Sequence, residues 1–159
     1  PCDASNTSLP DDFIDFHVSN TVFEHIPEDV LLNILKEGNR ITKQEGLFIN
    51  RIDYTDHFSH SDNSISEINF LQYSEKEWKS LAGNRYMYMN RLRHNDYLRL
   101  FELSGHSVCE VETYVNNDLL KVIEEKDFII SDDFILKSKN ELIIVGAWIV
   151  SRFKEMKSE

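Results

Sequence analysis

The sequence predicts an α/β protein. Short apolar runs of strand length alternate with segments that repeat with helical periodicity. The first three predicted elements follow the order strand, helix, strand, which is typical of parallel pairing with a right-handed crossover. The composition, 41% hydrophobic and 28% charged with only three prolines, is that of a folded chain. We expect one domain over residues 1–159, because no internal repeat or linker divides the chain.

The first strand–helix–strand unit is predicted as follows. Residues 13–19, "FIDFHVS", carry bulky side chains on both faces and predict a buried parallel strand. Pro27 is suited to the first position of a helix, and Gly46 is a stop signal for that helix. Residues 46–54, "GLFINRIDY", predict the second strand.

The rest of the chain supplies further elements of both kinds. They are predicted helices over 74–83 and 95–105, and predicted strands over 106–115 and 141–153. Ser74 and Glu77 form a capping-box pattern at the start of the first of these helices. Asn95 is the expected cap of the second, and Gly105 its stop. An open parallel sheet normally has more strands than these.

Charge and cysteine usage exclude several classes of protein. The net charge of −11 argues against a nucleic-acid surface and against binding to an anionic membrane, because both need clustered Lys and Arg. The longest apolar run, Leu142–Val150, has the length of a strand and not of a membrane span. We expect no signal peptide, and Cys2 and Cys109 lack metal-ligand spacing. We expect a reduced, cytoplasmic protein.

Several short motifs along the chain resemble, in the same order, those of one protein family. "CDA" (2–4) resembles an acid-plus-small pair that meets adenine, and "SNTVFEHIP" (19–27) resembles the segment that follows a fourth strand. "RITKQEG" (40–46) resembles the stretch before a fifth strand, and "NRLRHNDYLRLFELSGHSV" (90–108) is similar to an acceptor-side region. In this order and spacing, the motifs resemble the class I S-adenosylmethionine-dependent methyltransferases over nearly the whole chain.

The resemblance implies a partial domain. The family's glycine-rich loop and the acid after its second strand have no counterpart here. We therefore expect the C-terminal portion of a methyltransferase domain: a partial Rossmann-like sheet of the fourth to seventh strands with flanking helices. The strand at 13–19 would then be an exposed apolar edge, which invites pairing with another chain. The expected partner is a second copy (a homodimer) or the missing N-terminal half, and this fragment alone is expected to be inactive.

The resemblance also implies cofactor-binding residues. S-adenosylmethionine is the expected cofactor, with Asp3 and Ala4 at its adenine. Ser19, Asn20 and Thr21 follow a parallel strand at its carboxyl end, where open α/β sheets bind ligands. The alternative for both segments is ordinary turn chemistry with local hydrogen bonds.

Polar residues after the predicted strand 46–54 and near position 90 are expected at the part of the site that binds the methyl acceptor. The expected catalytic residues are His25, Asp56 and His57, and the expected substrate-binding residues are Asn90 and Arg91. Histidine suits general-base work near neutral pH, but positioning alone supplies much of the rate of a methyl transfer. The alternatives are helix capping for His25 and surface ion pairing for Arg93.

The polar run "DYTDHFSHSD" (53–62) is also a candidate metal site. Asp53, Asp56, His57, His60 and Asp62 are ligand types for zinc or iron. Two of these residues are adjacent and the others lie on an expected loop, so the sequence favours no bound metal.

The predicted function is S-adenosylmethionine-dependent methyl transfer to a small or sugar-linked acceptor, carried out by the intact protein. Two alternatives remain open from the sequence. One is a non-catalytic binding fragment that pairs through its strand edge. The other is a metal-dependent hydrolase built on the Asp/His run. The acceptor is a small molecule in the leading hypothesis, with no nucleic acid or membrane as partner.

Overall fold

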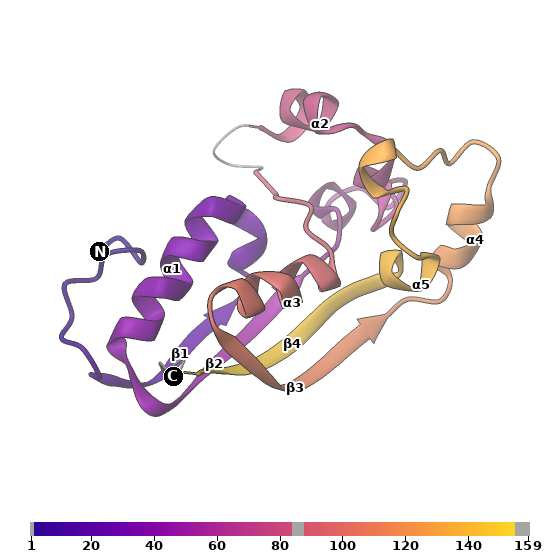
Figure 1. The fold of residues 1–159 in the computed structure, drawn as a ribbon. Coiled ribbons are helices and arrows are strands. Elements are labelled where there is room, and N and C mark those ends of the chain that lie inside the picture. Colours follow the sequence, from indigo (N-terminus) through magenta and orange to yellow (C-terminus); the bar gives the residue numbers. More distant parts are fainter. Residues whose placement is uncertain (1, 84–87, 155–159) are drawn as a thin grey trace.

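The computed structural model describes residues 2–83 and 88–154 and contains one mixed sheet with helices against it (Figure 1). The strands are β1 (Ile14–Asn20), β2 (Thr42–Asp53), β3 (His106–Val115) and β4 (Ile144–Phe153). The helices are α1 (Glu28–Ile41), α2 (Glu75–Ala82), α3 (His94–Leu103), α4 (Leu119–Glu124) and α5 (Lys139–Leu142). Short 3₁₀ turns are η1 (Phe23–His25), η2 (His57–His60), η3 (Asn69–Gln72) and η4 (Asp132–Phe134).

The order of the strands in the sheet is β1-β2-β4-β3. β1 and β2 are parallel and are joined through α1, whereas β4 runs antiparallel to both β2 and β3. α1 and α3 lie on one face of the sheet, and the smaller helices gather beyond one end of it (Figure 1). The α/β class and the parallel first unit are therefore confirmed.

The boundary between α1 and β2 differs from the prediction. The helix ends at Ile41 and the strand begins at Thr42, so Gly46 lies within β2 and does not stop the helix. The register of β1 against β2 shifts between Ile14 and Phe16, which places the irregularity beside Gly46. A Cβ at Gly46 would lie 2.9 Å from the carbonyl oxygen of Asp15. The glycine permits this close approach of two strands.

Later boundaries follow the prediction more closely. β3 covers the predicted residues 106–115, and Ser74 caps α2 through a capping box with Glu77. α3 begins at His94, one residue before the predicted cap Asn95, and the Arg93 N–H donates to the Asp96 carboxylate. α4 was not predicted, because its six residues are too few to show a helical period.

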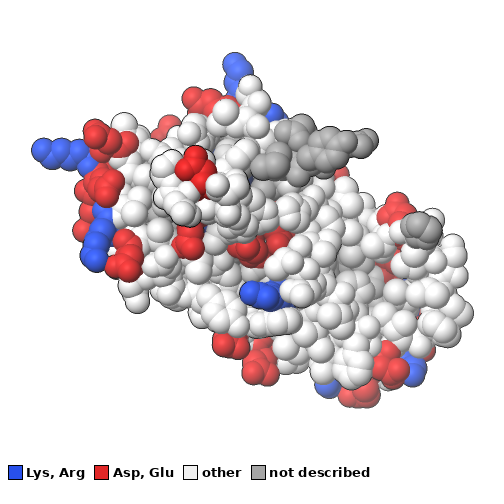
Figure 2. Space-filling model, turned by 180° about the vertical axis from the view of Figure 1, so that it is seen from behind, with Lys and Arg blue, Asp and Glu red and all other residues white. Residues whose placement is uncertain are grey.

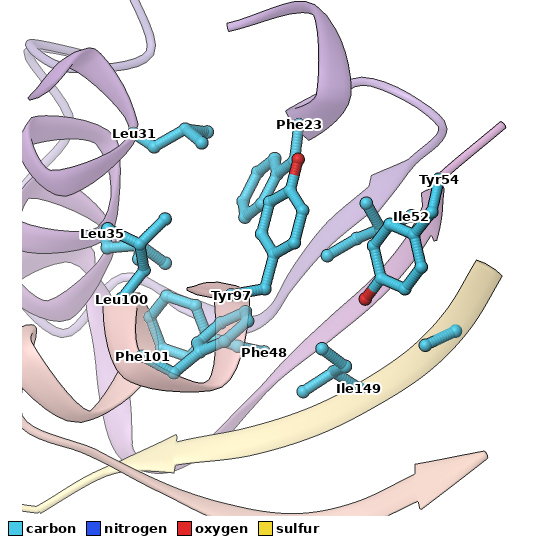
Figure 3. Close-up of a cluster of buried hydrophobic side chains, with 11 residues drawn as sticks. Phe23, Leu31, Leu35, Phe48, Ile52, Tyr54, Tyr97, Leu100, Phe101 and Ile149 are labelled. Carbon is cyan, nitrogen blue, oxygen red and sulfur yellow. The ribbon is translucent and has the colours of Figure 1, made fainter. Parts of the chain in front are cut away.

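The main core lies between the sheet and the two helices that cover it. Leu31 and Leu35 of α1 and Tyr97 of α3 point toward Phe48 and Ile149 of the sheet (Figure 3). The members of this cluster are Phe23, Leu31, Leu35, Phe48, Ile52, Tyr54, Tyr97, Leu100, Phe101, Ala147 and Ile149. Each large apolar side chain buried there contributes about 1.5–3 kcal/mol.

A second cluster is built from the segments beyond β2. Its buried members are Ile68, Phe70, Leu71, Trp78, Ala82, Met89, Leu119, Ile123, Phe134, Leu142 and Ile143. Arg93 is fully buried between the two clusters, with its guanidinium carbon 5.6 Å from the ring centre of Tyr54 and 5.3 Å from that of Phe70. This arginine therefore joins the two clusters.

β1 forms one edge of the sheet, and in the described residues it pairs on one side only. The alternate residues Phe16 and Val18 are 59% and 63% exposed. The prediction that this strand is buried is therefore wrong for these side chains, whereas the prediction of an exposed apolar edge is confirmed. His17, on the opposite side, stacks against Phe48 with ring centres 4.9 Å apart.

The surface carries more acid than base. The face turned away in Figure 1 shows acidic groups around wide uncharged areas, and the described Lys and Arg side chains do not gather there into a tract (Figure 2). None of the helices in 2–83 and 88–154 has the length and apolar composition that crossing a bilayer requires.

Candidate functional site

The carboxyl ends of β1 and β2 lie side by side and carry polar residues. β1 ends at Asn20, and Thr21 follows with a φ of 51°. A left-handed backbone is unusual for a β-branched residue and marks a constrained position. The Thr21 N–H donates to the carbonyl of Arg51 in β2, so the constrained turn stays attached to the sheet. η1 follows at once and carries Glu24 and His25.

Asn90 holds η1 in place. Its Nδ2 donates to the carbonyls of Phe23 and Ile26, at 2.8 Å in both cases. Its backbone N–H donates to the Glu24 carbonyl, and its Oδ1 accepts from the Tyr97 hydroxyl at 3.1 Å. Asn90 was expected to bind the acceptor, but its amide hydrogens are used to position Glu24 and its neighbours.

We expect Asn90→Ala to lower the free energy of unfolding by about 2 kcal/mol, because two buried carbonyls lose their donors. Asn90→Asp should cost more, since a carboxylate would face the same carbonyls without hydrogens to donate. Urea unfolding measures both effects. Asn95→Ala, an exposed asparagine of α3, is the control and should change stability by less than about 0.5 kcal/mol. Equal stabilities of the Asn90 and Asn95 variants would contradict this role.

His25 and His57 lie against each other across the two strand ends. Their ring centres are 4.8 Å apart at 62°. The His57 ring also stacks on His60, and His57 Nε2 lies 3.7 Å from Asp53 Oδ2. Two of the three expected catalytic residues are thus brought together, at the edge of the sheet where we expected them.

Glu24 is the most buried charged group of this cluster, with 2% of its surface exposed. Burial raises the pKa of its carboxyl to about 7. Burial also lowers the pKa of His57. A carboxyl and an imidazole whose pKa values are moved toward each other can exchange a proton near neutral pH, which suits general acid–base work.

Asp56, the third expected catalytic residue, is placed differently. It is fully buried, and its Oδ1 accepts from the Phe58 N–H as the cap of η2. Its Oδ2 accepts from Asn69 Nδ2 at 3.1 Å. Both oxygens of the Asp56 carboxylate are therefore bonded away from the rings of His25 and His57, although His57 is the next residue in the sequence.

Arg91 also points away from the histidines. Its guanidinium donates to the carbonyl of Tyr73 and to the carboxylate of Glu75, both at 2.6 Å, and it lies 3.5 Å from Asp133. The side chain is 4% exposed. The structure therefore does not bring Asp56 and Arg91 together with His57, because both side chains make their hydrogen bonds within the second cluster and its loops.

Of the residues expected to bind the cofactor, some line a groove and the others make local hydrogen bonds in turns. Ala4, Ser19 and Asn20 line one groove beside β1. The Asp3 carboxylate accepts from the N–H and the hydroxyl of Ser5, as in an ordinary Asx turn. The Thr21 hydroxyl donates to the adjacent carbonyl of Asn20.

The sequence-based site omitted Glu24, Asp53 and His60. Asp53 and His60 were considered as metal ligands only. The available signal was the acid–histidine pair before Pro27, which follows a strand directly. Its burial could not be anticipated, because the cover comes from Asn90 and its neighbours, far along the chain.

Several solved structures with this arrangement are described as methyltransferases. An S-adenosylmethionine-dependent methyltransferase of Methanosarcina mazei superposes with a TM-score of 0.56 at 14% identity, over 96% of this chain and 65% of the other. One of Mesorhizobium loti gives 0.56 at 11% identity, over 95% and 67%. The protein solved with the Haloferax volcanii Trm112 methyltransferase activator gives 0.53 at 19% identity, over 95% and 59%. The chain therefore spans about three fifths to two thirds of these structures' length.

A family model described as a methyltransferase domain matches residues 1–50. The matched segment is therefore similar to a methyltransferase domain. It contains β1, η1 and α1, and it ends within β2, so it includes both the groove residues and the acid–histidine pair. The resemblance to methyltransferases is confirmed over residues 1–50, and the solved structures confirm the α/β fold class. No curated protein is similar enough in sequence to match this chain.

Proposed function

We propose that the intact protein transfers a methyl group from S-adenosylmethionine to a small-molecule acceptor. The family match of residues 1–50 carries this proposal. In this proposal Ala4, Ser19 and Asn20 line the groove for the adenine end of the cofactor, and His25 and His57 face the acceptor. The family match favours methyl transfer over the two alternatives, a non-catalytic binding fragment and a metal-dependent hydrolase.

The transfer is a displacement at the methyl carbon, so the protein acts mainly by holding the two reactants in line. A side chain that accepts a proton is needed where the acceptor is a hydroxyl. With no metal bound, Glu24, buried and with a pKa raised to about 7, or His57 is suited to that step. The polar ends of β1 and β2 would orient the acceptor, and the exposed His25 would meet it first.

We also propose that this chain is the C-terminal portion of its domain. The similar structures are longer, and β1 lies at an edge of the sheet, where it exposes the side chains of Phe16 and Val18. A strand edge of this kind is normally covered in a native protein. We expect association through β1, with the N-terminal half of the domain as the favoured partner and a second copy as the alternative.

The test is cofactor binding by the full-length protein, measured by calorimetry with S-adenosylmethionine and with its demethylated product. The full-length protein should bind both, and this chain alone weakly or not at all. Ala4→Trp, an exposed position in the groove, should weaken binding by about tenfold or more, the free-energy equivalent of about 1.4 kcal/mol. Leu103→Trp, an exposed site on α3, should leave it unchanged.

Two results would overturn the proposal. One is a full-length protein that binds neither form of the cofactor. The other is equal affinity in the Ala4 and Leu103 variants, which would remove the groove beside β1 from the cofactor site.

A further inference from the structure

Potential metal ligands meet where the ends of β1 and β2 approach each other. The ligand atoms of Glu24, His25 and His57 all lie within 4.8 Å of one another. Those of Asp53, His57 and His60 form a second such group, so His57 is common to both. The contributing elements are η1, the last residue of β2 and η2, which come from two distant parts of the sequence.

Two buried groups of this cluster have no hydrogen-bond partner among the residues that the structure describes. One is the Glu24 carboxylate, where this holds for both oxygens although the residue is 2% exposed. The other is His57 Nε2, which is buried as well. Burying a carboxylate without a partner is costly, and buried charges are normally paired or bound to a metal. The two groups point at the same small volume, since their ligand atoms lie within the same 4.8 Å.

A hydrogen bond to His25 and a carboxylate beside His57 favour the binding of a metal ion by these histidines. His25 Nδ1 lies 3.0 Å from the carbonyl of Tyr88, to which it can donate its hydrogen. That hydrogen bond leaves the lone pair of His25 Nε2 free, which is how metal-ligating histidines are usually oriented. Asp53 Oδ2 lies 3.7 Å from His57 Nε2 and supplies a second negative charge beside it. Asn90 fixes the η1 backbone from the other side.

We propose that Glu24, His25 and His57 bind a divalent transition-metal cation of the zinc type, with Asp53 as the adjoining carboxylate. Imidazole nitrogens and carboxylate oxygens are ligands for this class of ion. Three protein ligands leave a coordination position open, and the exposed His25 connects it to solvent. Ligand atoms around tetrahedral zinc lie about 3.4 Å apart. Small side-chain rotations would bring the ligand atoms of Glu24, His25 and His57, now within 4.8 Å of one another, to that distance.

This assignment replaces the sequence-based interpretation, in which the Asp/His run held no metal. That interpretation considered residues 53–62 alone and did not include Glu24 or His25. Asp56 and Asp62, which the run also contains, belong to neither group. The inference does not depend on methyl transfer, because it rests on the ligand geometry and on the unpartnered carboxylate.

The test uses this chain, freed of metal by a chelator, with both exposed thiols removed by Cys2→Ser and Cys109→Ser. Zinc chloride is titrated by calorimetry, and cobalt(II) is added separately to follow visible absorption. We expect one equivalent of zinc to bind. Glu24→Gln and His25→Ala should each weaken binding by about 10²-fold, because outer-shell changes alone cost 10–100-fold. Asp62→Asn, the same acid-to-amide change at an exposed position, should bind as the parent does.

Each outcome decides the proposal. Absence of zinc binding, or equal affinity in the Glu24, His25 and Asp62 variants, overturns it and leaves Glu24 as a buried neutral carboxyl. His25 is exposed, so His25→Ala decides the question if Glu24→Gln does not fold. Loss of zinc binding in both variants, with parental circular dichroism retained, supports it. Failure of cofactor binding by the full-length protein would not affect this result.

Discussion

Arg93→Ala should lower the free energy of unfolding by about 5 kcal/mol, at the upper end of the cost of breaking a buried charge network. The guanidinium donates to three carbonyls, those of Tyr54 (2.6 Å), Leu142 (2.9 Å) and Ile144 (2.6 Å). Alanine would leave all three without this donor and would open a cavity between the two apolar clusters. A domain has only about 5–15 kcal/mol of stability in total, so this variant should be largely unfolded.

Graded substitutions separate the causes of that loss. Arg93→Met keeps much of the side-chain volume but no donor, and should cost about 3–4 kcal/mol. Arg93→Lys keeps a charge and part of the hydrogen bonding, and should cost about 2 kcal/mol, since an ammonium cannot match the planar guanidinium. Burial lowers the pKa of Arg93 to about 10, so the group remains charged at neutral pH.

Urea unfolding monitored by circular dichroism measures the series. Arg99→Ala on the exposed side of the same helix is the control and should change stability by less than about 0.5 kcal/mol. If Arg93→Ala stays within about 1 kcal/mol of the parent, the three carbonyl contacts do not stabilise the junction of the two clusters.

The role of Arg93 could not be predicted from the sequence. Within "NRLRHNDY" it is one of several polar residues, and surface ion pairing was one alternative for it. Its partners are backbone carbonyls 39, 49 and 51 residues away in the sequence. No local sequence pattern predicts such contacts, because every residue offers the same backbone carbonyl as an acceptor.

Elements with a local cause could be predicted. β3 alternates and ends at turn residues, and Ser74 carries its capping partner three residues later, so both followed from the sequence. Gly46 could not be assigned correctly from its neighbours, because its role depends on the approach of Asp15 in another strand. A glycine after a helical pattern is equally typical of a helix stop.

The meeting of His25 and His57 was predicted from the sequence, but the other members of the candidate cluster were not. The carboxyl ends of the first two strands were identified from chain order, and His25 and His57 do meet there. Asp56 and His57 are adjacent, yet one is buried as a cap and the other faces His25. The direction of a side chain in a short 3₁₀ turn depends on packing, which the sequence does not display.

We expect the stability of the fold to fall by about 3 kcal/mol between pH 6.5 and pH 4 through His106 alone, at about 1.36 kcal/mol per pKa unit. Burial lowers the pKa of His106 from 6.5 to about 4 in the folded protein, with His17 nearby adding to the effect. The ring is 8% exposed and lies among Phe48, Phe101 and Phe153. The unfolded chain takes up the proton first, so the contribution is complete above pH 6.5 and is lost as the pH falls.

His106→Gln should remove this part of the pH dependence while a side-chain amide still reaches the Ser151 hydroxyl, which lies 3.0 Å from His106 Nδ1. Urea unfolding at pH 8 and at pH 4.5 measures it: the gap between the two pH values should shrink by about 2–3 kcal/mol in the variant. Ser151→Ala is the control, because it removes the same hydrogen bond without removing the titrating group. It should lower stability by a similar amount at both pH values and keep the full acid-induced loss. An unchanged gap in His106→Gln would show that other groups cause the acid sensitivity, among them His17 and His94, whose pKa values burial also lowers.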